Sequence, residues 1–199
     1  MTHEFRGAEL PAEFQWLRTP NPERLFTMTG ECLRLSGRES LGSWFEQSLV
    51  ARRQEEAADA AEVEFRANPP GWQQAVGLIT YSNRHKFHAA LITRERGERV
   101  VTLVSCLGDW PGEALTFQGQ VPLPEGPIRI GVTVDGAIRQ FTVNGVTLGP
   151  VLDASVVSDE GGRGEHASFT GAFVGMVAYD LTGQGWTADG MRFSYANQI

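Results

Sequence analysis

Paired carboxylates are the first groups to consider, because two of them facing one cleft can carry general acid and base chemistry. On a β-strand, two side chains share a face only at alternate positions, and Glu62 and Glu64 have this spacing. They flank Val63 and precede Phe65, a pattern that turns the apolar side chains inward and the carboxylates outward. No Glu-x-Asp sequence occurs in the chain. We interpret Glu62 and Glu64 as solvated groups and expect no catalytic pair.

Nucleophilic and zinc chemistry find equally little support. The chain has no Gly-x-Ser-x-Gly motif, and neither Cys32 nor Cys106 has a histidine neighbour that would activate a thiolate. His85 and His88 are three residues apart and would point to opposite faces of a strand, with no second cluster to complete a zinc site. The glycine-rich stretch 161–164 follows no strand-to-helix pattern and is typical of a flexible loop.

Calcium is the more serious metal candidate, because a β-sandwich can hold an oxygen-ligated ion at a loop or strand edge. Three carboxylates are available as ligands, those of Glu4, Asp180 and Asp189. The alternative is that all three are solvated surface acids. We expect that no cofactor is required and keep calcium as a possible ligand.

Aromatic side chains near loops can stack on the apolar face of a sugar at little entropic cost. Packing in the core is the competing interpretation for each of them. The candidate platforms are Trp44, Trp72, Trp110, Trp186, Phe169 and Phe173.

The elements that must position these side chains are strands, because apolar and polar residues alternate along most of the chain. Ile128, Ile130, Val132 and Val134 fall on one face of such a strand. Two turn dipeptides follow, at 135–136 and 144–145, and both tolerate the positive φ of tight hairpins. Ile138 is out of register with the next strand, which indicates a bulge after the first turn.

Many short strands separated by turns predict one all-β sandwich or jelly roll spanning residues 1–199. One segment disagrees, since residues 54–61 are rich in helix formers and predict either two or three helical turns or a polar loop. We expect strands at 32–35, 48–52, 63–65, 75–81, 87–93, 100–105, 115–121, 128–135, 141–143, 172–178 and 191–195.

Charge and composition limit the possible partners. The formal net charge of −7 disfavours nucleic acid and anionic lipid as partners. No secretory signal and no apolar run of about 20 residues occurs, so we expect no membrane insertion and a cytoplasmic protein. Cys32 and Cys106 lie in apolar contexts and are interpreted as buried thiols, with a disulfide as the minority alternative.

Long ordered strings in the chain resemble one family, the C-terminal concanavalin A-like β-sandwich of glycoside hydrolase family 43 β-xylosidases. The resemblance runs from about residue 3 to residue 195. It is carried by FQWLRTP from Phe14, LRLSGRESLGSWFEQSLVARRQ from Leu33, QQAVGLITYSN from Gln73, GPVLDAS from Gly149 and FTGAFVGMVAYDLTG from Phe169.

The resemblance implies a jelly-roll sandwich of two antiparallel sheets that packs on a five-bladed β-propeller. In the family the propeller carries the catalytic carboxylates, and the sandwich closes its xylose or arabinose pocket with an aromatic side chain from a loop. That aromatic maps onto Phe169, with Phe173 as the second candidate. The resemblance therefore implies an accessory domain or subunit of a glycoside hydrolase. The alternative is a stand-alone carbohydrate-binding module for xylan-derived oligosaccharides.

Overall fold

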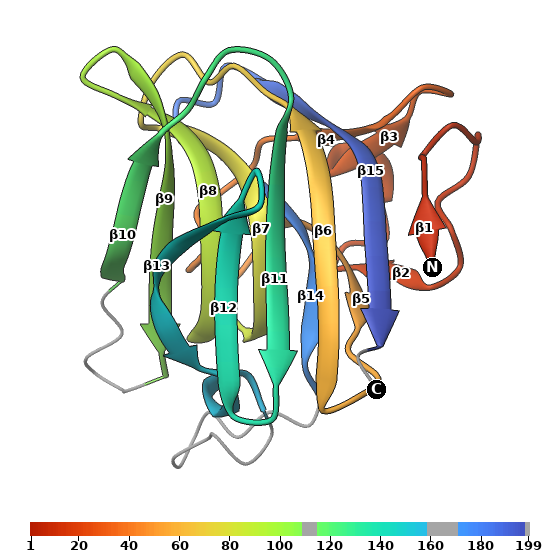
Figure 1. Ribbon diagram of the computed structural model, residues 1–199. Helices are drawn as coiled ribbons and strands as arrows, with labels where there is room; N and C mark the ends of the chain where they lie inside the picture. The colour runs from red at the N-terminus through yellow and green to blue at the C-terminus, as the bar shows by residue number, and fades with distance from the viewer. Residues whose placement is uncertain (109–114, 159–170, 198–199) are drawn as a thin grey trace.

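Two antiparallel β-sheets pack face to face in the computed structural model, which describes residues 1–108, 115–158 and 171–197 (Figure 1). The eight-stranded sheet has the order β13-β12-β11-β6-β15-β4-β3, with β1 paired to β15. The seven-stranded sheet has the order β10-β9-β8-β7-β14-β5-β2. The predicted all-β sandwich of two antiparallel sheets is confirmed.

The strands of the eight-stranded sheet are β1 (Thr2–His3), β3 (Phe26–Met28), β4 (Leu33–Ser36), β6 (Ala58–Arg66), β11 (Ile128–Asp135), β12 (Ile138–Val143), β13 (Val146–Asp153) and β15 (Thr187–Asn197). Those of the seven-stranded sheet are β2 (Phe14–Trp16), β5 (Ser48–Arg53), β7 (Gln74–Asn83), β8 (Lys86–Glu95), β9 (Glu98–Leu107), β10 (Thr116–Pro122) and β14 (Phe173–Asp180). Two short 3-10 helices, η1 (Pro22–Arg24) and η2 (Ala154–Val157), complete the described elements.

Every predicted strand is present, and its bounds shift by a few residues at most ends. The exception is β6, which begins at Ala58 inside the segment where a helix or loop was expected. The helical alternative is wrong for residues 58–61, because β6 pairs with both β11 and β15 and this tertiary pairing overrides local helix propensity.

The two hairpins of the eight-stranded sheet follow the turn chemistry of the sequence. Asn144 and Gly145 both have positive φ, 50° and 81°, as a two-residue turn of this kind requires. Gly136 has a φ of 55° in the turn between β11 and β12. The bulge expected after that turn is not between these strands, since Asp135 pairs with Ile138 in unbroken register and Ile138 simply faces outward. The register shift lies on the other side of β12, toward β13.

Apolar side chains between the sheets form the main core. The alternating residues of β11, Ile128, Ile130, Val132 and Val134, are all buried as predicted, and the first three belong to this core. Cys32 and Cys106 are also buried and do not form a disulfide. Within the described residues, no helix has the length and apolarity needed to cross a membrane.

Candidate functional site

The outer face of the seven-stranded sheet is itself apolar, although it does not face the other sheet. β7, β8 and β14 are buried along almost their whole length, which requires apolar side chains on both faces of each strand. The outward set forms a second apolar cluster of Leu41, Leu49, Ala51, Ala75, Ile79, Tyr81, Phe87, Ala89, Leu91, Cys106 and Val177. Two cavities are lined by members of this cluster, so this face is the candidate site.

The smaller cavity lies beside Phe173, the first residue of β14 and the second aromatic candidate of the sequence. It has a volume of about 190 Å³ and is lined by Trp16, Leu49, Tyr81 and Phe173 among others. Phe173 is half-buried, and the guanidinium of Arg53 lies 4.9 Å from its ring centroid. An aromatic wall with an adjacent cation is suited to the apolar face and hydroxyl groups of a sugar, or to a side chain of another protein.

Tyr81 is a buried residue with a polar group among those that line this cavity. Burial raises the pKa of its phenol to about 12, so the hydroxyl stays protonated at neutral pH. The hydroxyl donates a hydrogen bond to Oε1 of Gln47 over 3.3 Å. The chemistry available in the cavity is therefore contact and hydrogen bonding.

The larger cavity has a volume of about 460 Å³ and is lined by Trp72, Arg84, Leu91, Leu115 and Leu181 among others. Leu91 lies on β8, whereas Leu181 follows the end of β14, so the cavity spans several strands of the same sheet. Most of its wall is apolar. The cavity is therefore suited to binding through apolar contacts, and few of its groups could position a reacting atom.

The structure separates the five aromatic candidates other than Phe173 into three groups. Trp44 and Trp72 are exposed, with 61% and 64% of their surface accessible. Trp186 is half-buried and packs against the main core, so core packing explains its position. Phe169 and Trp110 lie outside the described residues, so the role of Phe169 stays a prediction.

The three calcium candidates are not brought together. Glu4 lies 3.9 Å from Nε of Arg192, and Asp189 accepts two hydrogen bonds from Arg34, at 2.7 and 2.9 Å. Asp180 belongs to the other sheet. Among the described residues, no group of three or more His, Cys, Asp or Glu side chains could hold a metal ion. Calcium therefore stays a possible ligand, to be tested by titration.

Asp180 has a structural role that explains its burial. Its carboxylate accepts hydrogen bonds from Nε2 of Gln74, from the backbone N–H and hydroxyl of Thr182 and from the backbone N–H of Trp186. Burial by itself would raise the pKa of this carboxyl, but these donors outweigh it and lower the pKa to about 2. The charged carboxylate fixes the turn after β14.

His85 and His88, the two histidines considered as zinc ligands, lie at the turn between β7 and β8 and on β8. His88 is buried on its strand. Nε2 of His88 lies 3.1 Å from the carbonyl oxygen of Asp153 and therefore donates to it, while Nδ1 accepts from the hydroxyl of Ser105 at 2.7 Å. Both ring nitrogens of His88 are thus engaged within the protein.

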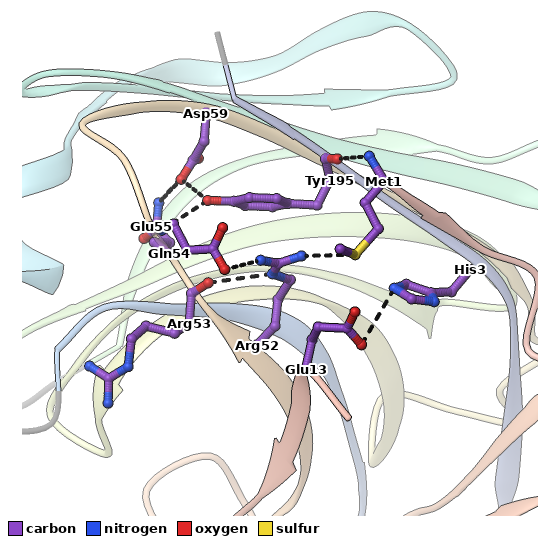
Figure 2. A network of polar contacts seen from close by, with 9 residues as sticks. All are labelled: Met1, His3, Glu13, Arg52, Arg53, Gln54, Glu55, Asp59 and Tyr195. Carbon is purple, nitrogen blue, oxygen red and sulfur yellow. Dashed lines mark hydrogen bonds and ion pairs between the residues drawn. The ribbon is translucent and has the colours of Figure 1, made fainter. Parts of the chain in front are cut away.

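A polar network joins the two sheets at one end of the sandwich (Figure 2). The hydroxyl of Tyr195 donates to Oδ2 of Asp59 over 2.8 Å and accepts from the backbone N–H of Glu55 over 3.0 Å. Gln54 donates to both oxygens of Asp59, and Arg52 donates to Glu55. Because Asp59 is 1% exposed, the donors from Tyr195 and Gln54 stabilise a carboxylate that would otherwise be costly to bury.

The sequence pattern does not identify three of these site residues, Trp16, Tyr81 and Arg53. Trp16 and Tyr81 lie in the quoted strings, but period-2 alternation assigns them only to a face and cannot say which face carries a cavity. The one available signal was the nearly continuous apolar run in β7 and β8, which indicates strands buried on both sides.

Comparison with protein families gives one match over almost the whole chain. The family model described as "Beta xylosidase C-terminal Concanavalin A-like domain" matches residues 2–196. The protein named xylosidase/arabinosidase 43B of Humicola insolens is 42% identical over 201 residues, which cover 94% of this chain and 36% of that protein. A putative β-xylosidase of Escherichia coli is 33% identical over 207 residues, covering 96% of this chain and 37% of that protein.

Solved structures agree with these matches. The crystal structure of a xylan β-1,4-xylosidase from Bacillus halodurans superposes with a TM-score of 0.88 at 25% identity, covering 98% of this chain and 39% of that chain. The chain therefore spans little more than a third of the length of the curated relatives it matches.

Proposed function

Because the chain belongs to the family of β-xylosidase C-terminal concanavalin A-like domains, we propose that it is the accessory sandwich of a β-xylosidase or α-arabinofuranosidase. In this role it packs on a five-bladed propeller that carries the catalytic carboxylates and closes the sugar pocket of that propeller. The single observation that carries the proposal is the match of nearly the whole chain to about a third of a xylosidase/arabinosidase.

The proposed contribution to catalysis is exclusion of water and fixation of the sugar. Phe169 is the aromatic that we propose to reach the pocket, on the strength of its place in the family resemblance. Phe173, four residues later, lines the aromatic cavity on the outer face of the seven-stranded sheet. A closed, dry pocket strengthens the electrostatic action of the propeller carboxylates and holds the glycosidic bond for attack.

Co-expression with a propeller tests the proposal. The remaining part of the Humicola insolens relative, without its matched region, serves as the propeller, and the relative's own matched region is the positive control. We expect this chain to co-purify with it and to raise its hydrolysis of an aryl xyloside at least about tenfold. Phe169→Ala should keep the complex and lose most of that increase. A chain that neither binds nor activates the propeller would contradict the proposal.

A second candidate is the stand-alone carbohydrate-binding module, favoured by the exposed Trp72 beside the larger cavity. Titration calorimetry of the isolated chain with xylo-oligosaccharides distinguishes the two functions. Saturable binding that is lost in Trp72→Ala and kept in Phe169→Ala would support the module. An absence of binding heat under conditions where the propeller complex forms would support the accessory domain.

A further inference from the structure

Two adjacent aromatic side chains, Trp44 and Phe45, stand exposed on the loop between β4 and β5, with 61% and 80% of their surface accessible. Neither contributes to the described apolar clusters. A pair of large aromatic residues in water is unfavourable unless something covers it, and contiguous exposed apolar surface is typical of a binding interface.

The Trp44–Phe45 segment is held in place by its own loop. Leu41 is buried in the second apolar cluster and anchors the loop on the seven-stranded sheet. The buried amide of Gln47 donates to the carbonyl oxygens of Leu41 and Ser43, over 2.6 and 2.9 Å. The hydroxyl of Ser43 accepts from the backbone N–H of Phe45 over 3.0 Å. The aromatic pair is therefore presented in a fixed conformation, which lowers the entropic cost of binding.

Arginines surround the segment on a chain whose net charge is −7. The guanidinium of Arg84 lies 3.5 Å from the ring centroid of Trp44 and donates to the carbonyl oxygen of Gly42. Arg18 donates to the carbonyl oxygen of Trp44 over 2.8 Å. Tryptophan and arginine are the residues enriched in the hot spots of protein–protein interfaces. Anionic lipid and nucleic acid are less suitable partners, because the net negative charge of the chain repels them.

The segment is continuous with the candidate site. Arg18 follows Trp16 and Leu17, which line the smaller cavity together with Phe173. A partner that covers Trp44 and Phe45 would thus also reach the aromatic cavity and the start of β14. The same sheet face then carries both the contact and the aromatic cavity beside Phe173.

We propose that the Trp44–Phe45 segment is the docking surface for the catalytic propeller. This inference rests on the proposed function, and the occupant is chosen because the curated relatives extend well beyond the third of their length that this chain matches. Trp44 and Phe45 insert into the propeller surface, and Arg18 and Arg84 contact its carboxylates or carbonyl groups at the rim.

The test uses the same co-expression with the propeller part of the Humicola insolens relative. The double variant Trp44→Ser, Phe45→Ser should weaken the complex at least about tenfold, as measured by calorimetry, while the thermal midpoint of the isolated chain stays unchanged. Val146→Ser is the matched control, because Val146 is 70% exposed but lies on β13 of the eight-stranded sheet, away from both cavities. It should bind within about threefold of the wild type.

The remaining outcomes are distinguishable. If the wild-type chain binds and the double variant binds equally well, the docking surface is overturned and the proposed function stands. If the relative's own matched region binds the propeller but this chain does not, the proposed function falls and takes the docking surface with it. If the isolated chain dimerises and the double variant is monomeric, a second copy is the occupant and the inference is wrong.

Discussion

The guanidinium of Arg52 lies 3.9 Å from the centroid of the Tyr195 ring, so a cation of β5 stacks on an aromatic residue of β15. These strands belong to different sheets, and the contact lies within the network of Figure 2. Because Arg52 and Tyr195 are 2% and 4% exposed, the interaction is shielded from water and stronger than its surface equivalent.

Tyr195→Phe should separate the contribution of the hydroxyl to stability from that of the ring. The ring stays over Arg52, but Asp59 loses the hydroxyl donor at 2.8 Å and the N–H of Glu55 loses its acceptor. We expect a loss of about 1–3 kcal/mol in the free energy of unfolding, because a buried carboxylate is left with fewer donors. Urea unfolding at pH 7 measures it.

Tyr179→Phe is the control for this measurement. Tyr179 is half-buried on β14, and within the described part of the chain no hydrogen bond of its hydroxyl is found. Tyr179→Phe should lower the free energy of unfolding by no more than about 0.5 kcal/mol. Equal losses in the two variants would show that the hydroxyl of Tyr195 contributes nothing specific.

Gly77→Ala should be strongly destabilising. A Cβ atom at Gly77, in the middle of β7, would lie 1.8 Å from the carbonyl oxygen of Ala90 on β8. Neither backbone can move without breaking a central ladder, so we expect a loss of about 3 kcal/mol or more in the free energy of unfolding. Gly42→Ala, where a Cβ meets nothing within 4 Å, should be nearly neutral. Thermal unfolding of both variants measures the difference. A Gly77→Ala chain as stable as Gly42→Ala would refute the close approach of β7 at Gly77 to the carbonyl oxygen of Ala90.

Much of the fold was predictable because most strands carry their alternation in the sequence. Strand β11 shows this best, with four inward apolar residues in a row of alternate positions. The edge strand β13 was missed because only Leu148 and Leu152 of its eight residues are buried, and Pro150 interrupts the pattern. The start of β6 was missed because an inward Asp59 looks like a surface residue until its donors are known.

The candidate site was predictable only in part. Phe173 was found through its place in a long family string, and the structure puts it beside a cavity. Trp16 and Tyr81 reach the same cavity from β2 and β7, and no spacing in the sequence relates these strands to β14. Such convergence depends on the strand order of the sheet, which local patterns do not encode.

Calcium should leave the stability of the chain unchanged. Asp189 is already held by two hydrogen bonds from Arg34, and the carboxylate of Asp180 accepts from Gln74, Thr182 and Trp186. We expect thermal midpoints within about 1 °C in EDTA and in millimolar calcium chloride. A calcium-dependent rise of several degrees that disappears in Asp189→Asn would instead establish Asp189 as a ligand.

His88 should make stability depend on pH above the range where carboxylates titrate. Burial, with a smaller contribution from Arg139, lowers the pKa of His88 to about 4. In the unfolded chain the pKa is about 6.5, so the unfolded state binds more protons between these values and stability falls as the pH drops through this window. Between pH 7 and pH 5 the expected loss in the free energy of unfolding is about 2 kcal/mol.

Urea unfolding at the two pH values should show this loss in the wild type and in His3→Gln, which leaves His88 in place. In His88→Gln the stability at pH 7 falls as well, because two buried hydrogen bonds are altered, but the difference between the two pH values should vanish. A His88→Gln chain that keeps the full difference would assign the pH dependence to another group.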